Sequence, residues 1–308
     1  MNWTPLKAGD IVDLVAPASP LKDKAQLEGI LAFIRSLGLV PRYHDEILSQ
    51  VSDSHLPYHS NTDASRLKQL QTALYATDSQ AIWCVRGGYG SMKLLPGLSA
   101  LVPPQKSKLL IGFSDITMLH LFLNQQWGWE TVHGEMLSRW CAPEVRTKMQ
   151  HLIDVIFGKA KQLQYTGLKP LNQPAENKPT IRAPIIVGNL SLFQASLGTP
   201  WQLNPKDKIL ILEEVNENAY RIDRILEQFK QSKVLSGVKA IIFGDMATKV
   251  TEEESSLIDR MLIDFAKSHT FPIYQMKEIG HGDMNHPLPF GGEGVIGSDL
   301  RLTCRFRS

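Results

Sequence analysis

The sequence predicts an α/β fold in two domains, an N-terminal domain built on a parallel sheet and a smaller mixed α/β domain after it. Its 308 residues exceed the length of about 250 residues at which a single hydrophobic core usually stops growing. In the first half, short apolar runs alternate with longer amphipathic stretches, the rhythm of βα units. Between residues 166 and 182 this periodicity stops and three prolines lie among polar residues. We therefore expect domains at 1–168 and 183–308, joined by a linker at 169–182.

The first domain is expected to contain strands that are buried on both faces. The runs at 81–85 and 108–113 are almost entirely apolar, as in a parallel sheet covered by helices. A sheet of this kind places its ligand loops at the carboxyl ends of its strands. The elements expected here are strands at 11–16, 81–85 and 108–113 and helices at 22–37, 64–75 and 117–125.

The second domain is expected to mix strands and helices in an order that the sequence leaves open. We expect strands at 185–187, 208–212, 240–243 and 294–304 and helices at 219–230 and 252–268. In the first of these helices the apolar residues recur at intervals of three and four. This spacing indicates core packing rather than a recognition surface.

The composition is that of an ordinary globular protein, with 43% hydrophobic and 21% charged residues. Lys and Arg number 33 and Asp and Glu 31, which leaves a net charge of +2. No basic stretch is dense enough to follow a phosphate backbone, so we expect no nucleic-acid partner. No window approaches 18 consecutive apolar residues, so we expect no membrane span.

The cysteines and the first residues indicate a cytoplasmic protein. Cys84, Cys141 and Cys304 are an odd number, lie far apart and show no paired spacing for a metal or a redox dithiol. The first ten residues contain no cationic start followed by an apolar run of signal-peptide length. We therefore expect a reducing compartment, no metal and no cofactor.

Ser114 lies where an apolar run turns into a helical stretch. A serine at such a turn projects its hydroxyl from the carboxyl edge of the sheet, and the amide of Asp115 then points toward a developing oxyanion. The segment lacks the second glycine of the G-x-S-x-G motif. The alternative from this segment alone is that Ser114 or Asp115 caps the helix.

A glycine-rich loop follows the apolar run at 81–85. Gly87, Gly88 and Gly90 allow the backbone to approach a ligand with its amides unobstructed. This loop can supply a second oxyanion donor. The alternative is a nucleotide or phosphate loop, although neither G-x-G-x-x-G nor a following G-K-[ST] is present.

A nucleophilic serine needs a base, and among the nine histidines His281 lies in a glycine-flanked loop. His286 is the rival in the same loop, and either can be a loop imidazole bonded to backbone. His133 is interpreted as structural or substrate-facing.

For the orienting acid, an apolar run ends in Glu213 and Glu214, with Glu217 close behind. The alternative for these carboxylates is that they are solvated charges at the end of a strand. Arg221 and Arg224, on the predicted helix that follows, can face a carboxylate from its outer edge.

Five stretches in one order resemble the LD-carboxypeptidase family of serine peptidases, which includes the murein tetrapeptide carboxypeptidases and the microcin C immunity peptidases. Their joint occurrence across nearly the whole chain is far more specific than any one motif. The stretches are GDIVDLVAPAS from Gly9, VRGGYGS from Val85, IGFSDIT from Ile111, LILEEV from Leu210 with YRIDR from Tyr220, and GHG from Gly280 with LPFG from Leu288.

The resemblance implies a catalytic triad of Ser114, His281 and Glu213, with the nucleophile in the first domain and the base and acid in the second. The site is then expected between the domains. Glu213, rather than Glu214, follows the family pattern of the first carboxylate after the apolar strand.

The resemblance also implies oxyanion donors at the amides of Asp115 and Gly88, beside Gly87. It implies a first domain similar to the class I glutamine amidotransferases, and a homodimer. One departure is Glu135, where the family often has proline, and it concerns local substrate contacts.

The expected function is hydrolysis of the L,D-peptide bond before the terminal D-alanine of cytosolic murein tetrapeptides, as in peptidoglycan recycling. One alternative is an immunity-type peptidase that cleaves aminoacyl-nucleotide conjugates. Another, from a different class, is a noncatalytic module that binds a nucleotide or an anion through the glycine loop.

Overall fold

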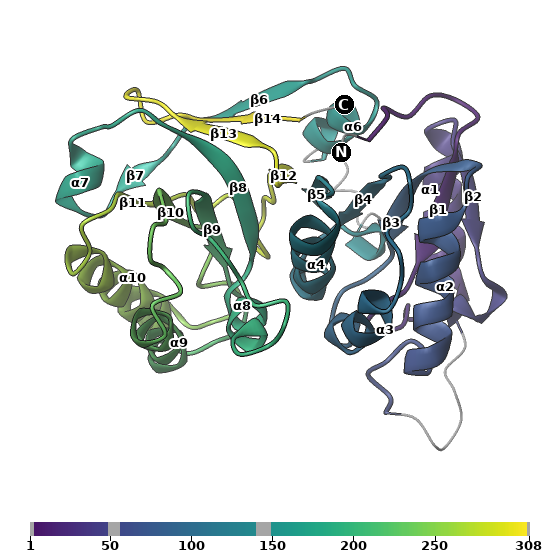
Figure 1. Cartoon of the computed structure of the whole chain (residues 1–308), viewed down its shortest axis with the longest axis horizontal. Coiled ribbons are helices and arrows are strands. Elements are labelled where there is room, and N and C mark those ends of the chain that lie inside the picture. Colours follow the sequence, from purple (N-terminus) through teal and green to yellow (C-terminus); the bar gives the residue numbers. More distant parts are fainter. Residues whose placement is uncertain (1–2, 49–55, 140–148, 307–308) are drawn as a thin grey trace. The chain divides into compact units, whose positions relative to one another are not determined.

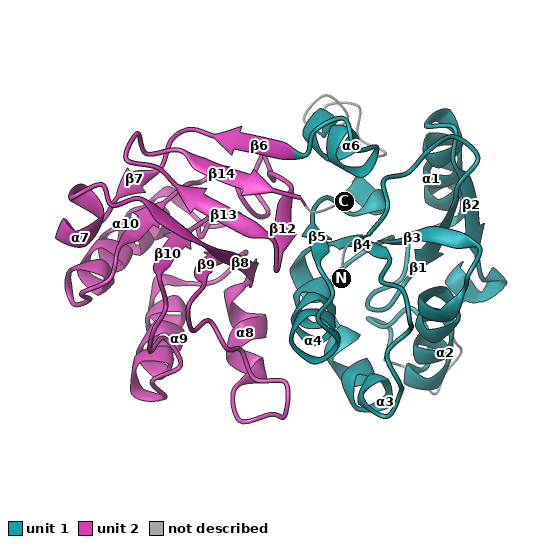
Figure 2. Ribbon diagram, turned by 45° about the horizontal axis from the view of Figure 1, so that its top comes forward, with its two compact units in different colours: residues 1–161, 307–308 teal, residues 162–306 magenta. Residues whose placement is uncertain are grey.

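The computed structural model describes residues 3–48, 56–139 and 149–306. These residues fall into two compact units, with the boundary between Lys161 and Gln162 (Figure 2). The stretch expected as a linker, 169–182, instead contributes a short strand, a short helix and the start of a long strand to unit 2. Cys141 lies outside the described residues.

Unit 1 is built on a parallel sheet, as the apolar runs predicted. Its strands lie in the order β5-β4-β3-β1-β2, and every neighbouring pair in this series is parallel. All four residues of β4 are buried, as are five of the six in β3. The strands are β1 (Ile11–Val15), β2 (Val40–Tyr43), β3 (Ser79–Cys84), β4 (Leu109–Gly112) and β5 (Thr131–His133), as Figure 1 shows.

Two helices of unit 1, α1 and α2, begin at residues that cap their N-termini. Asp23 accepts a hydrogen bond from the Gln26 amide, and Thr62 accepts one from the Ser65 amide. The α-helices are α1 (Lys24–Ser36), α2 (Asp63–Tyr75), α3 (Leu95–Ser99), α4 (Thr117–Trp127) and α6 (Gln150–Ile156), and the 3₁₀ helices are η1 (Asp45–Leu48), η2 (Ser91–Leu94), η3 (Ser114–Ile116) and η4 (Leu137–Arg139).

Unit 2 contains a mixed sheet in the order β6-β14-β13-β8-β9-β10-β11-β7. The strands from β8 to β11 pair in parallel, and the remaining pairs are antiparallel. The strands of unit 2 are β6 (Gln162–Tyr165), β7 (Lys169–Pro170), β8 (Ile181–Asn189), β9 (Ile209–Glu213), β10 (Ala240–Phe243), β11 (Ile273–Gln275), β12 (Leu288–Phe290), β13 (Glu293–Ile296) and β14 (Leu302–Arg305).

The long strand β8 joins the two parts of this sheet (Figure 1). Its first half pairs with β13 in antiparallel register, and its second half pairs with β9 in parallel. The expected single strand at 294–304 is instead the hairpin of β13 and β14, because the chain turns back through a hydrogen bond from the Gly297 amide to the Arg301 carbonyl.

The helices of unit 2 are α7 (Gln173–Glu176), α8 (Leu190–Ser196), α9 (Ala219–Gln231) and α10 (Glu252–Lys267). In α9 the buried side chains are Ile222, Ile225, Leu226 and Phe229, so the predicted core face is confirmed for these four, whereas Tyr220, expected with them, is 57% exposed. Across the stretches of both units that the structure describes, none of the helices combines the length and apolar character needed to cross a bilayer.

Candidate active site

In unit 1, Ser114 lies at a sharp turn between β4 and η3. Its backbone is left-handed, with φ of 60°, while Phe113 before it is extended. A non-glycine residue in this region is strained, and such strain gathers at functional sites. The N-cap residues of η3 and α4 are Phe113 and Ile116, and neither makes a side-chain cap hydrogen bond. The turn instead has the strand–turn–helix form of a nucleophile elbow.

The glycine loop predicted as an oxyanion donor lies directly beside this serine. A methyl group added at Gly87 would lie 3.1 Å from the Ser114 Cβ and 3.3 Å from its Oγ. Gly88 has φ of +102°, and a Cβ there would lie 2.1 Å from the Ser19 hydroxyl. Gly88 therefore requires glycine for its backbone conformation, and at Gly87 any side chain would crowd Ser114.

The side chain of Asp115 anchors the far end of the same loop. Its Oδ2 accepts a hydrogen bond of 2.8 Å from the Ser91 amide, and its carbonyl accepts one from the Ser91 hydroxyl. Burial raises the pKa of this carboxyl group above its ordinary value. The Asp115 side chain therefore has a structural role. The Asp115 backbone amide, at the start of the helix, is left for a ligand.

Two buried histidines, His120 and His133, contact the residues just before Ser114. The His120 Nε2 bonds to the Gly112 carbonyl at 2.9 Å and its Nδ1 to the Thr131 hydroxyl at 2.7 Å. Burial lowers the pKa of His120 to about 3, so this ring is neutral near pH 7. The His133 ring packs edge-on against Phe113 with centroids 5.7 Å apart. His133 therefore has the structural role that was one of its two interpretations.

Glu135, the departure from the family pattern, is also engaged within unit 1. Its Oε1 lies 3.1 Å from Nη1 of Arg139, and its carbonyl accepts a hydrogen bond from the Trp83 indole. The carboxylate is buried, and the Arg139 guanidinium balances its charge.

In unit 2, the carboxylate of Glu213 meets the imidazole of His281. The Glu213 Oε2 lies 2.6 Å from the His281 Nδ1. Glu213 is fully buried, whereas the His281 side chain is 15% exposed. A carboxylate bonded to Nδ1 fixes the proton on that nitrogen, so Nε2 becomes the proton-accepting atom.

Gly280 explains how the backbone comes so close to this pair. Its φ is +124°, and an added Cβ would lie 2.8 Å from the Glu213 Cβ and 2.9 Å from its Oε2. Only glycine fits both the conformation and the space. The glycine immediately before His281 therefore allows the Glu213 carboxylate to come close to the backbone of the loop.

The loop that carries His281 is closed by its own hydrogen bonds. The Gly280 amide donates to the Asn285 side chain at 3.0 Å, and the His286 amide donates to the Glu278 carbonyl at 3.0 Å. The His286 ring stacks on Tyr165 with centroids 4.0 Å apart and lies 3.3 Å from the Glu278 carboxylate. His286, the rival base, thus helps to hold the loop.

Glu214 has a different environment from Glu213, although both are buried. Its carboxylate accepts hydrogen bonds from the Asn189 side chain, the Ser191 amide and hydroxyl, and the Val215 amide. Burial and the neighbouring charge of Glu213 raise its pKa. Glu214 therefore ties the end of β9 to the start of α8, and Glu213 is the carboxylate that meets the histidine.

The remaining charged candidates lie at the start of α9. Glu217 and Arg221 form an ion pair of 3.5 Å, and the guanidinium groups of Arg221 and Arg224 lie 5.9 and 5.5 Å from the ring centroid of Tyr220. The structure places these residues together, and they line one pocket with Ser191.

Sequence reasoning missed three residues that position the candidate catalytic groups. Ser91 ties the glycine loop to Asp115, and Gly280 leaves room for the Glu213 carboxylate. Asn285 closes the loop that carries His281. All three lie inside the matched or flanking motif segments. Their position in those motifs was the available signal, but their individual roles depend on contacts that the sequence does not show.

Comparison with known protein families decides the affiliation. Residues 12–134 match the LD-carboxypeptidase N-terminal domain, and residues 182–296 match the LD-carboxypeptidase C-terminal domain. The chain belongs to the LD-carboxypeptidase family. Its activity is accordingly that of a serine-type LD-carboxypeptidase, and the family resemblance seen in the sequence is confirmed.

Among the relatives of this LD-carboxypeptidase-family chain, a putative carboxypeptidase of Rickettsia conorii is 38% identical over 78% of the chain and 75% of the relative. The murein tetrapeptide carboxypeptidase of Pseudomonas aeruginosa is 31% identical over 97% of both chains. A probable murein peptide carboxypeptidase of Bacillus subtilis is 29% identical over 96% of this chain and 92% of its own.

Solved structures show the same fold. An MccF-like protein from Bacillus anthracis has a TM-score of 0.82 at 22% identity and covers 99% of both chains. A muramoyltetrapeptide carboxypeptidase from Oxalobacter formigenes has a TM-score of 0.78 at 21% identity, over 96% of this chain and 98% of the other. The predicted two-domain α/β architecture is thereby confirmed.

Proposed function

We propose that this chain hydrolyses the L,D-peptide bond before the terminal D-alanine of murein tetrapeptides, with Ser114, His281 and Glu213 as its catalytic triad. The contact of 2.6 Å between the buried Glu213 carboxylate and the partly exposed His281 is the observation that carries this proposal. The near full-length similarity to a relative named murein tetrapeptide carboxypeptidase supports the choice of substrate.

In the proposed reaction, the His281 Nε2 takes the proton of the Ser114 hydroxyl as Oγ attacks the carbonyl carbon of the scissile bond. The negative charge on the carbonyl oxygen is stabilised by the amides of Asp115 and Gly88, and Gly87 leaves room for the substrate beside Oγ. Collapse of this intermediate breaks the C–N bond, and His281 donates its proton to the departing D-alanine nitrogen.

The acyl-enzyme is then hydrolysed by the same groups. His281 takes a proton from water, the resulting hydroxide attacks the ester carbon, and the proton returns to the Ser114 Oγ. In both halves of the reaction Glu213 stabilises the imidazolium that forms, because its carboxylate holds Nδ1–H in place. The convergence of Ser114 with His281 stays a prediction.

The setting of the reaction is also part of the proposal. We propose that the chain acts in the cytoplasm, as a homodimer, on peptides released from the cell wall. The cysteine pattern supports a reducing compartment, and Cys84 and Cys304 are buried free thiols whose pKa values are raised by burial.

The second candidate substrate is an aminoacyl-nucleotide conjugate. Solved structures titled microcin C7 self immunity protein MccF contain adenosine monophosphate or aspartyl sulfamoyl adenosine, and they share this fold with TM-scores of 0.78 and 0.77. At 20% identity they support the fold alone. A noncatalytic binding module is set aside because the chain belongs to a family of peptidases.

The proposal is tested by mass spectrometry of the products from a murein tripeptide, tetrapeptide and pentapeptide, with an aminoacyl-nucleotide conjugate in parallel. We expect D-alanine from the tetrapeptide alone. Ser114→Ala should reduce the rate on the order of 10⁴-fold or more. Release of D-alanine by Ser114→Ala at the wild-type rate would exclude the mechanism, and cleavage of the conjugate alone would exclude the substrate.

A further inference from the structure

Two tyrosine rings on the surface of unit 1 form a compact aromatic patch. Tyr58 is 44% exposed and Tyr89 is 48% exposed. Their ring centroids lie 5.6 Å apart, and their planes are tilted by 55°. Exposed aromatic rings that meet in this way are typical of a binding surface, since each ring offers an apolar face with a polar hydroxyl at its edge.

Tyr89 is held close to the proposed nucleophile by the loop on which it lies. At one end of this loop Gly87 packs against Ser114, and at the other end Ser91 donates two hydrogen bonds to Asp115. Tyr89 is two residues from each end, so its Cα lies at most about 7 Å from that of Gly87. Its side chain therefore projects from the immediate surroundings of Ser114.

The patch has a rigid base. The buried His59 ring stacks on Tyr89 with centroids 5.3 Å apart and meets Tyr58 edge-on at 4.7 Å. The Ser19 hydroxyl donates to the Tyr58 carbonyl at 2.7 Å and accepts from the Tyr89 amide at 3.2 Å. Because these contacts hold both segments before any ligand arrives, little entropy is lost when the rings bind one.

A buried arginine ties the segment after Tyr58 to the chain that follows β1. The Arg66 guanidinium donates hydrogen bonds to the Pro17 and Asn61 carbonyls and pairs with Asp63. A Cβ at Gly90 would lie 2.6 Å from the Arg66 Nη1 and 2.9 Å from the His59 ring. The glycine after Tyr89 thus allows the loop to close onto this support.

We propose that Tyr58 and Tyr89 form a subsite for the sugar ring that a murein peptide carries at the end opposite its terminal D-alanine. This inference rests on the proposed function. A pyranose chair presents a puckered C–H face and polar edges, which suit two tilted aromatic faces with phenol hydroxyls. A flat nucleobase would be served better by a single parallel stack.

The length of the peptide agrees with this assignment. Three residues separate the scissile carbonyl from the sugar, and in extended form they span about 10 Å. The Tyr89 Cα lies at most about 7 Å from that of Gly87, and the tyrosine ring extends farther than its Cα. A peptide bound with its scissile bond at Ser114 can therefore bring its sugar over the patch.

The test compares kcat/KM for a free tetrapeptide with that for the same tetrapeptide carrying an N-acetylmuramyl group. In Tyr58→Ala and Tyr89→Ala, we expect the preference for the sugar-bearing substrate to fall about 10-fold, as for the loss of one aromatic contact. Tyr89→Phe should retain most of that preference, because the ring face remains.

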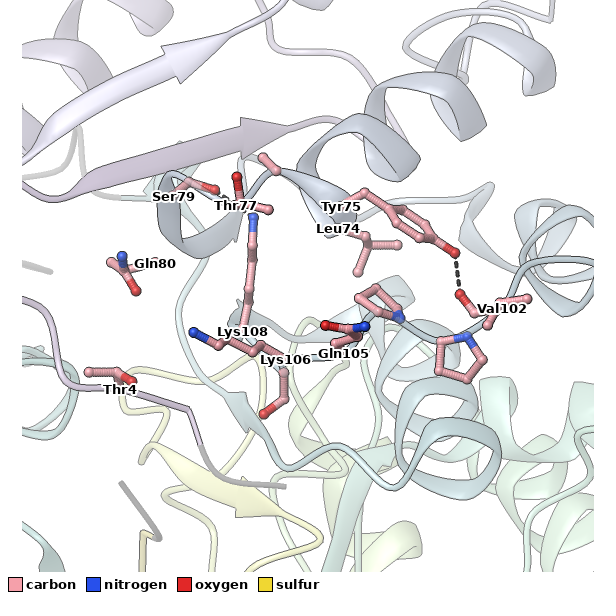
Figure 3. Close-up of a pocket in the computed structure, with 14 residues that line it drawn as sticks. Thr4, Leu74, Tyr75, Thr77, Ser79, Gln80, Val102, Gln105, Lys106 and Lys108 are labelled. Carbon is pink, nitrogen blue, oxygen red and sulfur yellow. Dashed lines mark hydrogen bonds between the residues drawn. The ribbon is translucent and has the colours of Figure 1, made fainter.

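Tyr75→Ala is the matched control, since Tyr75 is a tyrosine of the same unit that is 40% exposed. It lines a cavity of about 490 Å³ together with Ser79, the first residue of β3, and Lys108, which directly precedes β4 (Figure 3). This cavity lies at the amino ends of strands whose carboxyl ends lead to Gly87 and Ser114. Tyr75→Ala should leave the sugar preference unchanged.

The outcomes separate this inference from the proposed function. If wild-type protein cleaves the free tetrapeptide but both alanine variants keep the wild-type sugar preference, the subsite is wrong and the function stands. If the variants lose only the cleavage of an aminoacyl-nucleotide conjugate, the patch binds a nucleobase and the sugar assignment is overturned. If wild-type protein cleaves no murein peptide, the proposed function itself fails.

Discussion

The end of β4 in unit 1 and the end of β9 in unit 2 each position a proposed catalytic residue, but they do so by different contacts. Each strand leads to a proposed catalytic residue that is followed at once by a buried acid. Asp115 ties the glycine loop to the nucleophile turn, and Glu214 ties β9 to the start of α8. Ser114, however, is positioned by a left-handed backbone, whereas Glu213 is positioned by side-chain contact with His281.

This difference indicates which substitutions each region tolerates. A residue placed by backbone geometry can lose its side chain while the turn keeps its backbone conformation. A buried carboxylate placed by its partner cannot, because its desolvation is offset only while the partner remains. Activity and stability should therefore be separable at the β4 turn and linked around the Glu213–His281 pair.

Among variants of the residues that hold His281 and Glu213 in place, the largest loss of activity should come from Glu213→Gln. The glutamine side chain can present its NH₂ group to His281 Nδ1, which favours the wrong tautomer for a base at Nε2. We expect kcat/KM to fall about 10² to 10⁴-fold by analogy with other triads. Glu214→Gln is the matched control, with an expected loss below about 10-fold. Equal losses in the two variants would remove the distinction between these carboxylates.

The next effect should come from Gly280→Ala. The new Cβ would lie 2.8 Å from the Glu213 Cβ at a φ of +124°, and we expect a loss of stability of about 2 kcal/mol together with lower kcat. Gly167→Ala separates strain from crowding, since φ there is +95° and nothing lies within 4 Å of an added Cβ. Urea unfolding measures the loss of stability of each variant, and steady-state kinetics measures its kcat. If Gly167→Ala lowered kcat as much, crowding of Glu213 would not be the cause.

A smaller effect of opposite sign is expected for Ser114→Gly. Glycine adopts φ of 60° without strain, so the variant should be more stable than wild type by about 1 kcal/mol. It should also be inactive, because the proposed nucleophile is lost. Denaturant unfolding checks the stability, with Ser114→Ala as the comparison that keeps a Cβ. A destabilised glycine variant would show that the serine side chain, not the backbone, holds the turn.

The smallest effect concerns pH and Asp115→Asn. Burial raises the pKa of the Asp115 carboxyl group above its ordinary value, so the folded state favours its protonated form. This contribution to stability is full below the ordinary aspartate pKa and is lost as the pH rises through the raised one. Relative to wild type, the asparagine variant should therefore gain stability in urea titrations as the pH rises above the ordinary aspartate pKa. If the difference in unfolding free energy between the asparagine variant and wild type stayed constant as the pH rose, the raised pKa of Asp115 would be contradicted.

Part of this account was accessible from the sequence because it depends on local pattern. The apolar runs of β3 and β9 predicted buried strands, and the order of the motifs predicted Ser114, Glu213 and His281 as candidates. The pairing of β8 with both β13 and β9 depends on a hairpin that local periodicity does not reveal.

Other features required coordinates for a physical reason. Neighbouring strand residues point to opposite faces, so the sequence alone does not tell which of Glu213 and Glu214 meets the histidine. The left-handed conformation of Ser114 is unusual for a serine and has no compositional signature. The role of Gly280 likewise depends on the close approach of a distant strand.

The central claim, that Ser114 and His281 act as one catalytic unit, is tested most directly by a double-mutant cycle. Rates of D-alanine release are measured for Ser114→Ala, His281→Ala and the combined variant on the murein tetrapeptide. If the two residues share one proton transfer, each single loss is on the order of 10⁴-fold and the combined loss is no larger. If the two losses multiply, the residues act independently and the proposed triad is wrong.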